Sequence, residues 1–253
     1  MNYLSVFKTK LFLNLRAEAS KTYLGYLWWV LEPGLHVVVL YFVFGVFLQR
    51  GTEHFVVFLV CGLIPFLWLS RTVSNSASAI LVNRGIINQT AIHKAFFPLL
   101  VVFQDFTKQI FVFLLMFAFL GMNGFLPGIE WLGLVPIITT ELLLIIACSL
   151  IAAAIVPFIP DIRYIIATGL MLLMFGSGIF YSYEQVLLPQ HRQWFLLNPM
   201  ANLVKNYRQV IMHGEWPDWQ ALAIIALAST VVIFLMLRVY KRADTAFARL
   251  VAQ

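Results

Sequence analysis

Charged residues are scarce in this chain. Asp, Glu, Lys and Arg make up 11% of its 253 residues, against roughly 25% in a soluble domain, whereas hydrophobic residues make up 62%. Water therefore cannot be the solvent for most of the chain, and the lipid bilayer must be. The basic residues stand singly or in pairs at the ends of apolar runs. The net charge of +6 thus indicates topology signals and contacts with membrane lipids, and we expect no nucleic-acid partner.

Motifs for catalysis and for ATP binding are also missing. The sequence contains no Gly-Lys dipeptide and hence no P-loop, so any ATP must be hydrolysed by a partner. Its acidic residues are isolated rather than clustered around a magnesium site, and no His-Glu-x-x-His helix or Gly-x-Ser-x-Gly elbow occurs. Cys61 and Cys148 lie inside apolar runs and the histidines are dispersed, so we expect neither a disulfide nor a metal site. A membrane glycosyl or acyl transferase would need an acidic or histidine site that is not found.

Long apolar runs dominate what is present. A membrane-spanning helix needs about 20 predominantly apolar residues, so the runs predict one all-α integral membrane domain, 1–253, with six transmembrane helices. The predicted spans are 24–48, 55–77, 96–121, 131–156, 164–181 and 219–237. Spans one to five thus occupy 24–182, and 219–253 holds span six and a basic cytoplasmic tail. Pro33 and Gly34 interrupt the first span, which predicts a kink or a re-entry there.

Two further segments are amphipathic. Residues 1–23 place apolar side chains at helical spacing among basic ones, which predicts an interface helix on the cytoplasmic surface. Residues 183–218 predict an external gate hairpin of two short re-entrant helices. Within it, Asn198 is the expected N-cap, Pro199 the first helical residue and Gly214 the end of the helix.

The distribution of basic residues predicts the orientation. The first 23 residues carry charges throughout and so do not resemble a cleavable signal peptide. With the N-terminus inside, the cytoplasmic segments hold Lys8, Lys10, Arg16, Lys21, Arg84, Lys94, Arg163, Arg238, Lys241, Arg242 and Arg249. The external segments hold only Arg50, Arg192, Lys205 and Arg208. This asymmetry predicts that both termini are cytoplasmic.

Ionisable residues within spans are candidates for function. Here they are Arg71, Asp105, Lys108 and Glu141. Lys108 and Glu141 lie at similar depths on antiparallel neighbours, at about 1.5 Å per residue, and we expect them to form an ion pair. Asp105 shares a helical face with Lys108. Two interpretations stay open: a charge network that fixes helix packing, or a polar patch on a translocation path.

Several short motifs follow one another along the chain in a specific order. They are Leu24-Gly25-Tyr26-Leu27-Trp28-Trp29-Val30-Leu31-Glu32-Pro33, Phe96-Phe97-Pro98, Pro160-Asp161-Ile162-Arg163, Asn198-Pro199-Met200, Tyr207-Arg208 and Gly214-Glu215-Trp216-Pro217. Their order over nearly the whole chain resembles the permease subunit of bacterial ABC exporters for cell-surface polysaccharides: O-antigen, teichoic acid and capsule. One departure is Pro160, because many members carry Arg before the aspartate, which leaves a charge role for that loop open.

The resemblance implies a half-transporter in the bacterial inner membrane. It would pair with a second copy and with two cytoplasmic ATPase subunits that hold ATP and magnesium, and this chain itself would hold no cofactor. The cargo would be a lipid-linked polysaccharide, with O-antigen on undecaprenyl pyrophosphate preferred, moving through a channel between the two permeases. The alternative is an ABC permease for a small drug or lipid.

The resemblance also assigns expected roles to residues. Leu24 and Gly25 match a lipid-headgroup loop, and the nearby cations Arg16 and Lys21 would meet a pyrophosphate or act only as topology signals. The ATPase would contact the interface helix and the segment with Arg84, Asn88, His93 and Lys94. The external gate would include Trp194, Asn198, Pro199, Tyr207 and Arg208.

Aromatic and serine side chains complete the expected path. Aromatic rings offer a sugar polymer flat stacking surfaces, although most rings in spans face lipid or the interface. The expected channel residues are Tyr41, Phe42, Trp68, Phe175, Phe180 and Tyr181. Ser70, Ser74 and Ser78 recur every four residues and form a polar stripe, either for close helix packing or for lining a lumen.

Overall fold

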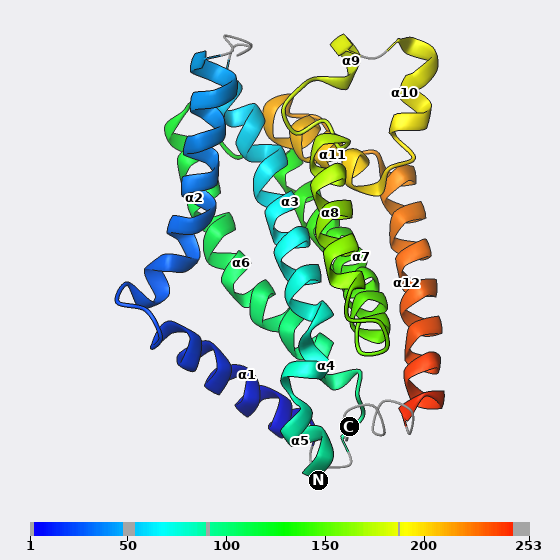
Figure 1. The fold of residues 1–253 in the computed structure, drawn as a ribbon. Helices are drawn as coiled ribbons and strands as arrows, with labels where there is room; N and C mark the ends of the chain where they lie inside the picture. Colours follow the sequence, from blue (N-terminus) through cyan, green and yellow to red (C-terminus); the bar gives the residue numbers. More distant parts are fainter. Residues whose placement is uncertain (1–2, 48–53, 90–91, 187, 245–253) are drawn as a thin grey trace.

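Helices make up most of the part of the chain that the structure describes. The computed structural model describes residues 3–47, 54–89, 92–186 and 188–244, and within these ranges it contains no strand (Figure 1). This confirms the all-α prediction. Some predicted features lie outside the described residues: Leu48 at the end of the first span, Arg50 and Arg249 in the charge count, and the side chain of Asn88.

Among the described residues, five helical segments are long and apolar enough to cross a membrane. They are η1–α2–η2 (Gly25–Leu27, Trp28–Leu40, Tyr41–Phe47), α3 (Phe55–Ala77), α6 (Phe96–Met122), η3–α7 (Ile129–Gly133, Leu134–Ile155) and α12 (Trp219–Arg242). Each lies within a few residues of a predicted span, because the apolar runs that a bilayer requires are uninterrupted there.

The fifth predicted span, 164–181, is only partly helical. It corresponds to α8 (Ile162–Phe175), whose 14 residues are fewer than the about 20 that cross a bilayer. Gly176 caps α8 and Gly178 turns the chain with a φ of +68°. A Cβ on Gly178 would also lie 3.1 Å from the Phe195 ring, so only glycine fits this turn. Five of the six predicted spans thus match helices that are long and apolar enough to cross a membrane. Helix α8, at the predicted fifth span, is too short by itself.

Helix α3 is the central element of the bundle. In its most apolar stretch 72% of the residues are buried, and it contacts α2, α6, α7, α8 and α11. By contrast, 6% of the corresponding stretch of the first span and 11% of that of α12 are buried. The first span and α12 are therefore peripheral, and most of their apolar surface faces away from this chain.

Helix α1 (Tyr3–Ala19) slants beneath α2 and α6 at the end of the bundle where α12 also ends (Figure 1). The Phe7 ring meets Phe96 and Phe103 edge to face at 5.4 and 5.6 Å. Asn14 donates a hydrogen bond to Gln104 at 3.3 Å. The chain then turns upward through Gly25, whose φ of +51° favours glycine. The predicted N-terminal helix is thus confirmed, although it ends at Ala19.

The first span does not break at Pro33. Helix α2 continues through Pro33, although proline has no amide to donate to the Trp29 carbonyl oxygen one turn earlier. Membrane helices tolerate proline where neighbouring groups satisfy the freed carbonyl. The irregularity comes later, as the π-helical segment η2. Of the two predicted alternatives, the re-entry near Pro33 is wrong because the helix continues, and the kink stays a prediction.

In their described part, residues 183–218 form three helices, where two were predicted, at the opposite end of the bundle from α1 (Figure 1). They are α9 (Tyr183–Val186), α10 (Pro189–Phe195) and α11 (Pro199–Met212). Asn198 accepts a hydrogen bond from the Met200 amide at 3.0 Å, and Gly214 follows with a φ of +63°, which confirms the predicted start and end of α11. Helix α11 contacts α3 and α7 and buries most of its side chains.

A hydrogen bond anchors α11 to the bundle. The Tyr207 hydroxyl donates to Glu141 Oε2 on α7 at 2.6 Å, and both side chains are fully buried. The other carboxyl oxygen, Glu141 Oε1, has no hydrogen-bond partner among the described residues. Because a buried polar group is costly when left unpaired, this one bond stabilises the contact between α7 and α11.

We therefore expect Tyr207→Phe to lower the free energy of unfolding by about 1–3 kcal/mol, since it strands the Glu141 carboxyl in an apolar core. Thermal unfolding of the purified protein in detergent measures this loss. Tyr164→Phe is the matched control, because the Tyr164 ring is exposed and its hydroxyl meets only the neighbouring Arg163. Equal midpoints for the two variants would contradict the anchoring role.

Candidate functional site

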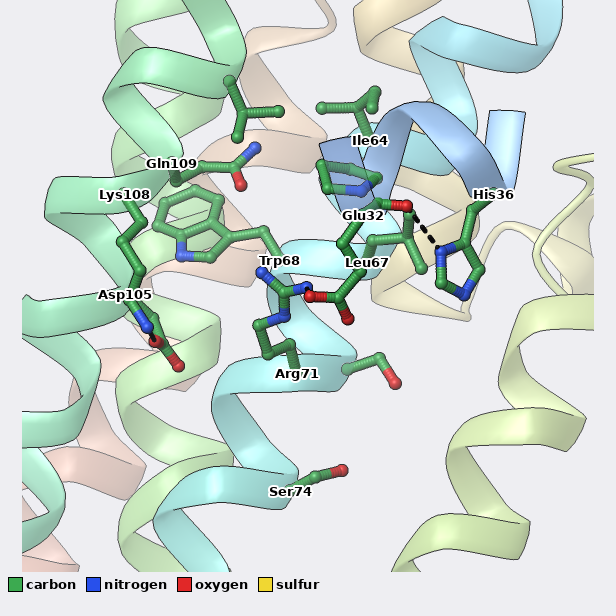
Figure 2. A pocket seen from close by; sticks show the side chains of 13 residues that line it. Glu32, His36, Ile64, Leu67, Trp68, Arg71, Ser74, Asp105, Lys108 and Gln109 are labelled. Carbon is green, nitrogen blue, oxygen red and sulfur yellow. Dashed lines mark hydrogen bonds and ion pairs between the residues drawn. The ribbon is translucent and has the colours of Figure 1, made fainter. Parts of the chain in front are cut away.

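A polar cavity lies between α2, α3 and α6. Its volume is about 240 Å³, and Figure 2 shows the side chains that line it. Four charged side chains contribute to the lining: Glu32, Arg71, Asp105 and Lys108. The remaining lining residues include Trp68, Gln109, Ser70 and Ser74. A polar cavity between membrane-spanning helices is a candidate for function, because polar surface there is costly.

Lys108 is held by two carboxylates. Its ammonium lies 2.7 Å from Asp105 Oδ1 on the same helix and 2.8 Å from Glu18 Oε1 on α1. Asn75 on α3 donates to the other Asp105 oxygen at 3.1 Å. The Lys108 and Asp105 side chains are 8% and 4% exposed, so each charge depends on the other for compensation. The network ties α1, α3 and α6 together.

A second ion pair crosses the cavity. Arg71 on α3 pairs with Glu32 on α2, and Figure 2 shows the two side chains pointing toward each other. Both side chains are partly exposed to the cavity. With Lys108 paired to Asp105, two cations face two carboxylates in the lining. The cavity is therefore close to charge balance, which favours a neutral polar guest over a strongly charged one.

Two buried donors in the lining lack a partner. Trp68 Nε1 and Gln109 Nε2 make no hydrogen bond within the described part of the chain. Buried donors are almost always satisfied, by protein or by an ordered water or ligand. Both side chains line the cavity. Both nitrogen atoms are enclosed by neighbouring atoms, so they are unsatisfied donors within the cavity wall.

The structure brings three of the four predicted intramembrane charges together. Arg71, Asp105 and Lys108 line one cavity, but Glu141 lies elsewhere, bonded to Tyr207. The expected ion pair between Lys108 and Glu141 was wrong. Depth along two helices does not fix the rotation of each about its axis, and α1 places the nearer Glu18 carboxylate against Lys108.

The six predicted channel aromatics are divided between two places. Trp68 lines the polar cavity and packs between Phe106 and Phe113, at 5.9 and 5.8 Å. The others lie toward the external end. Phe180 stacks on Phe44 at 4.7 Å and contacts Phe175 at 5.6 Å. The Tyr181 hydroxyl donates to the Phe175 carbonyl at 3.0 Å, and Tyr41 and Phe42 are exposed on η2. Their role in a channel stays a prediction.

Besides Tyr207, a second predicted gate residue acts as a structural anchor. Arg208 is buried and donates to the carbonyl oxygens of Gly178 at 2.7 Å and Ile179 at 2.9 Å, so it pins α11 to the turn after α8. Its guanidinium lies 3.3 Å from the centre of the Phe58 ring. Trp194 is largely exposed on α10. A second hollow of about 450 Å³ opens here, lined by Arg208 and side chains of 177–184 and α11.

Three known proteins align with nearly all of this chain, although no protein-family profile matches it. The O-antigen export system permease protein RfbA of Klebsiella pneumoniae is 23% identical over 239 residues, 94% of this chain and 91% of that protein. The protein of the same name from Myxococcus xanthus is 27% identical over 237 residues, 93% and 91%. The polysialic acid transport protein KpsM of Escherichia coli is 29% identical over 245 residues, 92% and 91%. The chain is a homologue of polysaccharide-export permeases. The resemblance drawn from its motifs is confirmed.

In this permease homologue the predicted headgroup residues cluster at the turn after α1. Leu24 and Lys21 are exposed, and Gly25 supplies the left-handed turn. Arg16 is exposed in the last turn of α1. Neither cation has a carboxylate partner among the described residues. Both are thus available to an anion, and their role stays a prediction.

The predicted coupling segment has one buried member. Arg84 on α5 (Arg84–Gln89) and His93 are exposed, whereas Lys94 is buried and pairs with Asp244 beyond α12 at 3.0 Å. Lys94 therefore fastens this segment to the end of α12. Helix α4 (Ala79–Val82) links α5 to α3.

Sequence reasoning missed Glu18, Asn75 and Gln109 as members of the site. For Glu18 a signal exists: it follows Leu11 and Leu15 at positions i+7 and i+3, on the apolar face of α1. A carboxylate on an apolar face needs a cation. Asn75 and Gln109 carry no comparable signal, because a single polar residue in a span does not reveal the side on which it lies.

The ion-pair network gives a test of stability for this permease homologue. Lys108→Met leaves the buried Asp105 charge uncompensated and should lower the free energy of unfolding by roughly 3–5 kcal/mol. The double variant Asp105→Asn, Lys108→Met removes both charges and should recover most of the loss. Glu18→Gln removes a half-exposed partner and should cost at most about 1 kcal/mol. Thermal unfolding measures all three, and no recovery in the double variant would refute mutual compensation.

Proposed function

We propose that this chain is the membrane-spanning subunit of an ATP-driven exporter that moves a lipid-linked polysaccharide across the bacterial inner membrane. One observation carries the proposal: similarity over at least 92% of the chain to proteins named for O-antigen export and polysialic acid transport. The charge-balanced polar cavity supports it, because a polysaccharide presents many hydroxyl groups. The chain acts as a transporter and not as an enzyme.

O-antigen on undecaprenyl pyrophosphate is the proposed cargo, which places the chain in lipopolysaccharide biosynthesis. The Klebsiella and Myxococcus relatives carry the O-antigen name, and the Leu24–Trp29 stretch resembles that branch. The proposed headgroup site is the turn with Leu24 and Gly25, together with the cations Arg16 and Lys21.

The proposed assembly is a homodimer with two ATPase subunits, which bind the ATP and magnesium, and a channel between the permeases. The missing P-loop supports an external energy source. Little of α2 is buried and α8 buries no side chain fully, which leaves apolar faces for a second copy or for lipid. The exposed Arg84 and His93 support ATPase contact by α5 and its neighbours.

The proposed topology has six crossings and cytoplasmic termini. Helix α8 and the turn at 176–182 would together make the fifth crossing, because α8 alone is too short to span the bilayer. Helices α10 and α11, which hold or adjoin the predicted gate residues, would be the external gate helices. Support comes from α1 and the end of α12 lying at one end of the bundle and α9 and α10 at the other (Figure 1). The excess of Lys and Arg at the α1 end indicates the cytoplasmic side.

Deletion of the gene in its own bacterium should abolish the full-length surface polysaccharide, and lipid-linked polymer should accumulate inside the cell. Gel analysis of surface polymer measures the loss, and a plasmid copy should restore it. Full-length polymer on the deletion strain would refute export. Intact polymer combined with altered drug sensitivity would instead support a small-molecule permease.

Filling the polar cavity should block export. Ser74 is exposed on the cavity wall, so Ser74→Trp should fit the fold, occupy the cavity and remove most of the surface polymer. Ala228→Trp is the matched control, because Ala228 is exposed on α12 and lines none of the hollows described above. Normal membrane levels of both variants with equal export would show that the cargo does not use this cavity.

A further inference from the structure

Two apolar hollows continue along the side of the bundle next to the polar cavity. The inner one, of about 720 Å³, lies between α1, the start of α2 and α6. The outer one, of about 490 Å³, lies between α2, α3 and α6. Val30 and Leu115 line both hollows, so the two form one continuous α2–α6 groove. Its walls are almost entirely aliphatic and aromatic.

The groove has the length of a long hydrocarbon chain. Along α2 it extends from Leu27 to Tyr41, which is roughly 20 Å at 1.5 Å per residue. One leaflet contributes about 15 Å to a hydrocarbon core of about 30 Å. The groove therefore reaches past the depth that one acyl chain of a phospholipid occupies, and a longer chain fits it better.

The groove is open because α2 packs loosely here. Gly34 lies in the wall of the outer hollow, and a Cβ placed on it would meet no atom within 4 Å. Leu115 and Val38 in the wall are exposed. Nothing in the described chain covers this apolar surface.

A cation stands at the inner end. Arg16 lines the inner hollow, is exposed, and has no carboxylate partner within the described chain. At the bilayer surface a guanidinium binds phosphate with two parallel hydrogen bonds. The groove thus offers a charged site for a headgroup at one end and an apolar path for a chain beyond it.

The groove also shares a wall with the polar cavity. Pro33, Ile64 and Val112 line both the outer hollow and that cavity. An amphiphile could therefore lie with its chain on one side of this wall while its polar part meets the polar side chains of the cavity on the other. The headgroup of an ordinary phospholipid is too short to reach from the groove into the polar cavity.

We propose that the α2–α6 groove binds the hydrocarbon chain of a long isoprenoid phosphate, with the phosphate at Arg16. The proposal rests on the proposed export function, for which it specifies where the lipid carrier binds. It adds an apolar binding site on the flank of each permease, separate from the polar cavity.

Photo-crosslinking tests the proposal. The purified full-length chain is placed in vesicles of phosphatidylethanolamine and phosphatidylglycerol with a diazirine-bearing polyprenyl phosphate. Labelled peptides should come from α2 and α6. Unlabelled polyprenyl phosphate should compete, and added phosphatidylglycerol should not. Equal competition by phosphatidylglycerol would overturn the proposal in favour of an ordinary lipid site.

Groove-filling variants sharpen the test. Gly34→Phe projects a ring into open space and should reduce labelling about tenfold, which is about 1.4 kcal/mol of binding free energy. Leu115→Trp, at the junction of the hollows, is an independent second variant. Arg16→Gln should reduce labelling by the phosphate and not by a polyprenyl alcohol. Gly121→Phe is the control, a helical glycine with open space that lies outside the groove lining.

The outcomes separate this proposal from the export function. Labelling that stays at the control level in Gly34→Phe and Leu115→Trp overturns the groove, even if the deletion strain loses its surface polymer. Loss of labelling with intact surface polymer in the deletion strain would instead retain the groove and refute polysaccharide export.

Discussion

The buried charge of Lys108 constrains the rest of this structure. In an apolar bundle an ammonium needs carboxylate partners, and one of the two that it finds belongs to α1. The ion pair therefore holds a surface helix against the bundle at a defined height on α6. The edge-to-face contacts of Phe7 extend that attachment further along α6. The position of α1 in turn creates the inner hollow, since Phe12, Leu15 and Arg16 form its wall.

The polar cavity and the apolar groove both follow from the loose packing of α2. Only Trp29 and Pro33 of α2 are buried, and between those contacts the helix stands away from α3 and α6. Where α3 and α6 present Arg71, Asp105 and Gln109 to α2, the space between the helices is the polar cavity. Along the flank of the bundle it is the apolar α2–α6 groove. A more tightly packed helix would have closed both. Membrane helices pack closely where small residues meet, and Gly34 faces open space instead.

The sequence predicted the elements of the fold better than their contacts. Helix α3 has the predicted bounds because a bilayer imposes a length on apolar runs, and α11 begins at Asn198 because a side-chain cap is local. Tertiary contacts depend on how each helix is rotated about its own axis, and no local sequence pattern determines that rotation. Thus Glu141 was expected beside Lys108 and instead bonds Tyr207. Arg208 was assigned to a gate from the family resemblance, and that role stays a prediction. Its bonds to carbonyl oxygens in the turn after α8 are a tertiary contact that no local pattern indicated.

The charge balance of the polar cavity favours the passage of a polymer over its tight binding. A polymer that moves through a site must bind each repeat weakly enough to leave it, as ions must in a selective channel. Unpaired cations would hold an anionic repeat or a phosphate strongly in a low-dielectric environment. Here Arg71 and Lys108 are both matched by carboxylates, so among the described residues the lining presents paired charges and polar side chains and no free cation. Arg16, a cation without a carboxylate partner among the described residues, stands at the groove end outside the cavity, where it would bind a phosphate without holding the sugar repeats in the cavity.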